Sequence, residues 1–118
     1  MAEHEREKPY VSPARREALR ICAGMLFRLV DVVEGCHRLT MLRRAAGIDE
    51  WDSDFAVFAD MSEEFDRLGA WEGRRYWSEE ELAKAVPDGR EIAARARAMT
   101  ARGCHSVMRR VFAEAGLS

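Results

Sequence analysis

The chain has 118 residues, of which 47% are hydrophobic and 34% are charged, and its formal net charge is −2. This composition excludes a disordered chain, which would have fewer apolar residues, and a membrane-spanning protein, which would have fewer charges. The longest apolar stretch, residues 21–33, contains Arg28 and Asp31 and is too short to cross a bilayer. We therefore expect one soluble domain. Its default location is the cytoplasm, because no apolar signal segment follows the polar start.

The N-terminal residues 1–11 are predicted to form a flexible polar arm, and residues 12–118 a single helical domain. Ser12 followed by Pro13 is typical of a helix start, with serine as the N-cap and proline in the first turn. Apolar residues then recur at spacings of three and four until Gly47, which is a natural helix stop. If unbroken, this first helix has about 34 residues and is roughly 50 Å long.

The middle of the chain is predicted to form shorter helices. Ser53 or Asp52 can cap one that holds Phe55, Phe58 and Met61, and Ser62 can cap a further turn. Ser78 followed by Glu81 is a capping box, and the short helix that it starts ends before Pro87. No strand-like alternation is present in the sequence.

The last predicted helix begins at Asp88 and ends near Gly116, and alanines make its first half slim. The predicted fold class is all-α, with two long antiparallel helices and short helices between them in a bundle-like arrangement. A homodimer would be a common way to bury the apolar stripe left over on such long helices.

The charges are distributed unevenly along the chain. Residues 49–88 hold 13 acidic and 4 basic residues, whereas the remainder holds 8 acidic and 15 basic residues. This asymmetry can steer a charged partner, but it also allows an acidic middle segment to fold back onto basic helices. We favour the second interpretation.

The three cysteines are too few and too widely spaced for a disulfide framework, so we expect reduced and mostly buried thiols. On one continuous helix, Cys22 and Cys36 would lie roughly 21 Å apart. The pairs Cys36-His37 and Cys104-His105 supply donor atoms that tetrahedral zinc accepts. Adjacent helical residues diverge by about 100°, so both members of a pair rarely reach one ion. Metal or small-ligand binding is therefore an alternative, and we expect no cofactor.

Arginines on the first and last predicted helices make nucleic-acid binding a further alternative. A binding surface needs these arginines on one face of a basic domain, whereas here they are spread around the helices of a slightly acidic chain. The sequence also lacks a phosphate-binding glycine motif and a nucleophile motif, so we expect no enzyme activity.

Aromatic and arginine residues gather between positions 71 and 77, and these residue types are enriched in binding hot spots. Alternatively, Tyr76 and Trp77 plug the end of the helices while the arginines pair with glutamates. The predicted partner-binding residues are Trp71, Arg74, Arg75, Tyr76 and Trp77, with Glu63, Glu64 and Asp66 steering a basic partner.

The stretch Ser62-Glu63-x-x-Asp66-x-Leu68, followed by Arg74-x-x-Trp77-Ser78, resembles short uncharacterised bacterial helical proteins. These proteins carry a similar acidic turn before Arg-x-x-Trp and a closing helix, and the likeness covers residues 55–110. The turn here lacks the proline expected after Leu68. The resemblance implies a small bacterial helical protein and no activity. The functional prediction is therefore a small cytoplasmic module that binds and blocks another protein, as immunity or antitoxin-like proteins do.

Overall fold

The computed structural model describes residues 12–45, 53–72 and 75–116. Its helices are α2 (Pro13–Leu26), α3 (Val32–Ala45), α4 (Ser53–Arg67), α5 (Glu79–Ala85) and α6 (Gly89–Glu114). The antiparallel strands β1 (Trp71–Glu72) and β2 (Arg75–Tyr76) form a small sheet. The chain is thus mostly helical, as predicted, and none of the helices in these ranges is long and apolar enough to cross a membrane. The predicted arm at residues 1–11 and the predicted stop at Gly47 lie outside the described residues.

The first predicted helix is replaced by two helices, so the expectation of one continuous helix was wrong. α2 ends in a Schellman turn in which Arg28 adopts a left-handed conformation with φ of 60°. The N–H of Leu29 donates to the carbonyl of Gly24 at 2.7 Å, and the N–H of Arg28 donates to the carbonyl of Met25 at 3.2 Å. These bonds satisfy carbonyl groups at the end of α2 and turn the chain back.

Asp31 then begins α3 and also supports α5. Its Oδ1 accepts the N–H of Val33 at 3.3 Å, which is the N-cap arrangement for α3. Its Oδ2 accepts the N–H of Glu79, the first residue of α5, at 2.9 Å. One carboxyl group therefore connects the turn after α2 to the start of a helix that lies 48 positions later in the chain.

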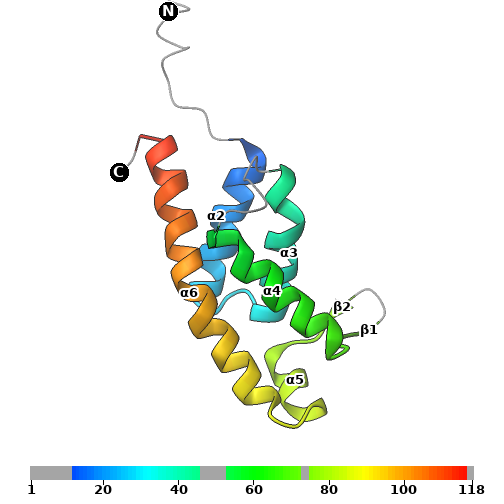
Figure 1. Ribbon diagram of the computed structural model, residues 1–118. Helices are drawn as coiled ribbons and strands as arrows, with labels where there is room; N and C mark the ends of the chain where they lie inside the picture. Colours follow the sequence, from blue (N-terminus) through cyan, green and yellow to red (C-terminus); the bar gives the residue numbers. More distant parts are fainter. Residues whose placement is uncertain (1–11, 46–52, 73–74, 117–118) are drawn as a thin grey trace, which may run out of the picture.

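The helices share one core, with α6 as the longest element (Figure 1). α6 packs against α2, α4 and α5, while α3 packs against α2 and α4. Gly103 permits a close approach of α6 to α4, because a Cβ there would lie 2.8 Å from the carbonyl oxygen of Asp54. The core is built from buried apolar side chains of all five helices named above, including Ile21, Val33, Leu39, Phe55, Phe58, Leu82 and Val107.

Some of the predicted helix boundaries agree with the structure and others do not. Ser62 is buried inside α4 and does not start a further turn. The capping box is confirmed, since the Ser78 hydroxyl accepts the N–H of Glu81 at 3.1 Å and the Glu81 carboxylate accepts the N–H of Ser78 at 2.9 Å. Asp88 precedes α6 as predicted, but it has φ of 63° and its side chain makes no capping hydrogen bond. Gly116, with φ of 74°, follows the end of α6.

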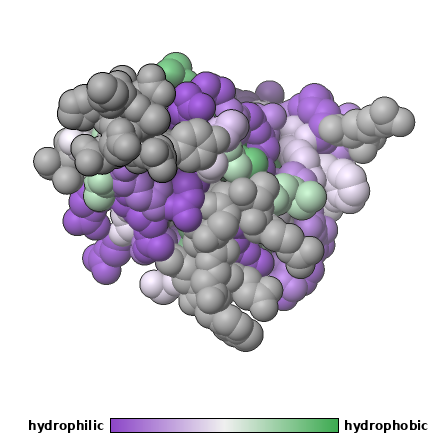
Figure 2. Space-filling model, turned by 90° about the horizontal axis from the view of Figure 1, so that it is seen from above, coloured by the Kyte–Doolittle hydropathy of each residue, from purple (hydrophilic) through white to green (hydrophobic). Residues whose placement is uncertain are grey.

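The surface of the described residues is predominantly hydrophilic in the view from above (Figure 2). Some large apolar side chains are nevertheless exposed, among them Phe27, Leu29 and Trp71. Two of them flank Arg28 in the turn after α2, and the third lies on β1.

Candidate functional site

Three aromatic rings stack at the small sheet. Trp71 and Tyr76 are partners across β1 and β2, and their ring centroids lie 5.9 Å apart with an interplanar angle of 16°. The ring of Tyr76 also lies 4.3 Å from that of His37 on α3. Trp71 is 50% exposed. We call these three rings the aromatic stack, in which the half-exposed Trp71 packs on Tyr76.

Arg75 and Glu81 hold the hairpin against α5. Two guanidinium nitrogens of Arg75 contact the two carboxylate oxygens of Glu81, each at 2.7 Å. The Arg75 guanidinium, together with the N–H of Ser78, lowers the pKa of Glu81 to about 2. The sequence predicted that Arg75 contacts a partner or, alternatively, pairs with a glutamate, and the structure shows the pairing with Glu81. The ion pair therefore orients the hairpin. Because both side chains are exposed to solvent, the pair contributes little to the free energy of folding.

A pocket of about 370 Å³ lies beside the aromatic stack and carries the carboxyl groups of Asp31 and Glu34. The Arg97 guanidinium is close enough to Asp31 to favour its charged form. Glu34 is exposed and forms no hydrogen bond or ion pair within the part of the chain that the structure describes. Asp31 is half-buried, and this burial raises its pKa even though two N–H donors favour the charged form. Because Arg75 is neutralised by Glu81, the pocket suits a cationic group. It is lined by Asp31, Glu34, Arg75, Tyr76, Trp77 and Ser78.

Trp77 and Asp66 complete the surroundings of Tyr76. Trp77 is partly buried and packs against the core, which agrees with the alternative in which it plugs the end of the helices. Asp66 is exposed, and burial together with this nearby carboxylate raises the pKa of Tyr76. Arg74 lies outside the described residues.

The two other predicted acidic residues lie on α4. Glu63 is exposed, whereas Glu64 forms an ion pair with Arg67 three positions later. The structure thus brings Trp71, Tyr76 and Trp77 together at one place, and Glu64 is partly neutralised within its own helix.

The two Cys-His pairs do not assemble a metal site. Within residues 12–45, 53–72 and 75–116, no group of three or more histidine, cysteine, aspartate or glutamate side chains could hold a metal ion. Cys36 and Cys104 are buried in the core, whereas His37 belongs to the aromatic stack and His105 is exposed. The members of each pair therefore face different environments.

The cysteines instead come together in the core from α2, α3 and α6. All three are buried free thiols, as predicted. A hydrogen bond between the Cys22 and Cys104 thiols, together with burial, raises the pKa of Cys22, and burial raises the pKa of Cys36. The expected separation of Cys22 and Cys36 along one helix does not apply, because the break after α2 places them on adjacent helices.

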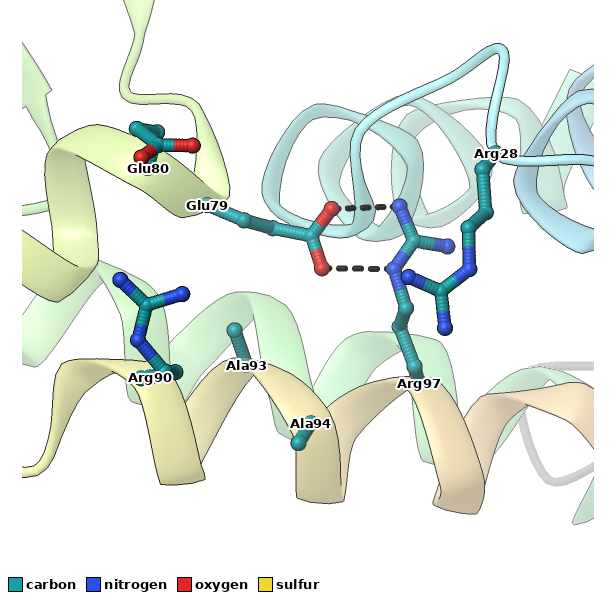
Figure 3. Close-up of a pocket in the computed structure, with 7 residues that line it drawn as sticks. All are labelled: Arg28, Glu79, Glu80, Arg90, Ala93, Ala94 and Arg97. Atoms are coloured by element: carbon teal, nitrogen blue, oxygen red, sulfur yellow. Dashed lines mark hydrogen bonds and ion pairs between the residues drawn. The ribbon is translucent and has the colours of Figure 1, made fainter.

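A second pocket, of about 340 Å³, lies between α5, α6 and the turn after α2 (Figure 3). Arg97 closes one side of it by a bidentate ion pair with Glu79, in which Nε lies 2.6 Å from Oε1 and Nη2 contacts Oε2. Glu79 raises the pKa of Arg97, and Nη1 of Arg97 donates to the carbonyl of Met25 at 2.8 Å. The lining residues are Arg28, Glu79, Glu80, Arg90, Ala93, Ala94 and Arg97. We call this the arginine pocket.

Ion pairs between described residues join the basic last helix to the acidic middle segment. Arg97 pairs with Glu79, and Arg110 pairs with Asp54 at 3.0 Å. These contacts support the interpretation that the uneven charge distribution serves the fold itself.

No protein-family model, curated protein or solved structure matches this chain. The functional assignment therefore depends on the geometry of the described residues.

Proposed function

We propose that this chain is a small cytoplasmic protein-binding module on a bundle-like helical scaffold, of the bacterial immunity or antitoxin-like kind, which binds and blocks a basic partner protein. The observation that carries the proposal is the half-exposed Trp71, held by stacking on Tyr76, which in turn contacts His37.

The aromatic stack has the properties of a binding hot spot. Tryptophan and tyrosine dominate the energetics of many interfaces, because they bury a large area with few rotatable bonds. Covering the exposed half of Trp71 would contribute roughly 2 to 3 kcal/mol. The ring is already ordered by its neighbours, so little side-chain entropy is lost when a partner binds.

The charges around the stack favour a basic partner. Glu34 and Asp31 line the adjacent pocket, and exposed Asp66 lies near Tyr76. A lysine or arginine side chain of the partner would enter this pocket, where the two carboxyl groups attract a cation. Glu63 on the surface of α4 adds to the negative potential that steers such a partner.

The test is affinity capture with the tagged full chain from its native host, followed by identification of the bound protein. Trp71→Ala removes the exposed ring, and Met99→Ala is the matched control, because Met99 is 47% exposed but lies on α6. We expect one stoichiometric protein partner, retained by Met99→Ala and lost with Trp71→Ala. The association rate with that partner should fall as salt is added.

Equal recovery of the partner with Trp71→Ala and with the unmodified chain would contradict the proposal. Stoichiometric nucleic acid or metal in place of a protein would favour the two alternatives predicted from the arginines and from the Cys-His pairs.

A further inference from the structure

The arginine pocket contains two arginines that have no ion-pair partner among the described residues. Arg28 reaches it from the turn after α2, and Arg90 from the first turn of α6 (Figure 3). Both are exposed, and neither forms a hydrogen bond or an ion pair with the other described residues. Their guanidinium N–H donors are therefore available to a ligand.

The third arginine of the pocket, Arg97, already has hydrogen-bond partners within the chain. Arg97 is held by Glu79 and by the carbonyl oxygens of Met25 and Val30, the latter at 3.4 Å. Figure 3 shows Ala93 and Ala94 on α6 between Arg90 and Arg97. Because alanine side chains are short, they leave space for a ligand between the two ends of the pocket.

The charge balance of the pocket indicates the chemistry of that ligand. The Arg97–Glu79 pair is neutral, and Glu80 opposes one of the two unpaired arginines, so one net positive charge remains. The pocket therefore favours an anionic ligand. The planar guanidinium group presents parallel N–H donors that match the two oxygens of a carboxylate.

The backbone of Arg28 points to the same conclusion. Its φ of 60° lies in the left-handed region, where glycine is the favoured residue at this position of a Schellman turn. A side chain held at a strained position indicates a role for that side chain. We propose that the arginine pocket binds a carboxylate-bearing ligand, with Arg28 at one end of the pocket and Arg90 at the other as the groups that contact it.

The volume of the pocket, about 340 Å³, is in the range of small-molecule sites. It accommodates a free carboxylic acid or the glutamate side chain of an acidic peptide. The site uses different residues from the aromatic stack, so it does not depend on the protein-binding function proposed above.

The test is titration of the full chain with N-acetylglutamate and with a blocked hexaglutamate peptide, at constant ionic strength, by calorimetry. The pocket variants are Arg28→Gly and Arg90→Gln. The control is Arg95→Gln, because Arg95 is exposed on α6 but does not line the pocket. We expect saturable binding that weakens about tenfold or more in each pocket variant, since charge-assisted hydrogen bonds are lost. Arg95→Gln should change the affinity by less than about twofold.

Arg28→Gly also separates binding from folding. Glycine suits the left-handed backbone, so this variant should unfold at the same temperature as the unmodified chain or higher, while losing affinity. Saturation by N-acetylglutamate would identify a small carboxylic acid as the ligand, and saturation by the peptide alone would identify an acidic protein segment. Either result supports a carboxylate site. The absence of saturable binding, an equal loss in Arg95→Gln, or tighter binding of inorganic phosphate at the same ionic strength would overturn it.

Discussion

Arg97 forms hydrogen bonds with three other segments of the chain, and its replacement by methionine should strongly destabilise the fold. The guanidinium forms a bidentate pair with Glu79 of α5 and donates to the carbonyl of Met25 in α2 and to that of Val30 in the following turn. Methionine keeps part of the apolar stem but removes the charge and these hydrogen bonds. The side chains of Arg97 and Glu79 are only 15% and 26% exposed, so solvent screens the pair incompletely.

The magnitude follows from these contacts. A hydrogen bond to a charged group contributes at least about 1.5 kcal/mol, and breaking the pair leaves Glu79 as a poorly hydrated charge. With partial screening taken into account, Arg97→Met should lower the free energy of unfolding by about 3 kcal/mol. This is a large share of the roughly 5 to 15 kcal/mol that stabilises a typical domain. The melting temperature should fall by about 10 °C.

Urea unfolding at pH 7, followed by circular dichroism at 222 nm, measures this loss directly. Arg97→Lys is the matched control, since it keeps the charge but not the planar fork, and it should lose less stability than Arg97→Met. A double-mutant cycle with Glu79→Gln should give a coupling energy of about 2 kcal/mol. A loss below about 1 kcal/mol for Arg97→Met, or a coupling energy near zero, would refute the reasoning.

Three further predictions concern packing, pH and thiol reactivity. Gly89→Ala should lower the free energy of unfolding in urea by about 2 kcal/mol, because its Cβ would lie 2.1 Å from the backbone oxygen of Leu82. Gly35→Ala should lower it by less than about 1 kcal/mol, because its Cβ would meet the flexible side chain of Met25. Equal losses in the two variants would contradict the packing argument. The pKa of Glu81 is lowered from 4.5 to about 2, so its contribution is complete above pH 4.5 and is lost as the pH falls toward 2. NMR signals of the Arg75 guanidinium should follow this loss, and Glu81→Gln should abolish the pH dependence; an unchanged titration in the variant would assign it to another group. The three core thiols should react with a thiol-specific disulfide reagent only at the rate of unfolding, and a fast reaction in the native state would show that the core opens locally.

The sequence predicts those parts of the fold that depend on neighbouring residues. Ser12 before Pro13, and Ser78 with Glu81, mark helix starts because each cap is a local hydrogen bond. Gly116 marks a helix end for the same reason, since it supplies the left-handed conformation. The break after α2 was not predicted, because the apolar spacing of three and four residues continues through the turn and the left-handed residue there is an arginine.

The site could be predicted only in part. The residues between positions 71 and 77 were selected by type, and the described ones among them do gather at the hairpin. His37 was named as an alternative metal ligand and was not predicted at the hairpin, yet it contacts Tyr76, which is 39 positions away. The arginine pocket combines Arg28 and Arg90 only because the chain reverses after α2. Contacts of this kind arise from tertiary packing, and the spacing of residues along one helix carries no information about them.

The turn between α2 and α3 also bears on how copies of the chain could assemble. Its residues keep the helical phase of α2, so the same segment is compatible with a continuous helix. The reversal is held by the left-handed backbone of Arg28, by the cap that Asp31 forms, and by the hydrogen bonds that Arg97 donates to the carbonyls of Met25 and Val30. If these contacts were lost together, the two helices could join into one, and α2 could then pack against α3 of a second copy. The contacts of this one turn therefore oppose the exchange of a terminal helix between two chains, a domain-swapped dimer.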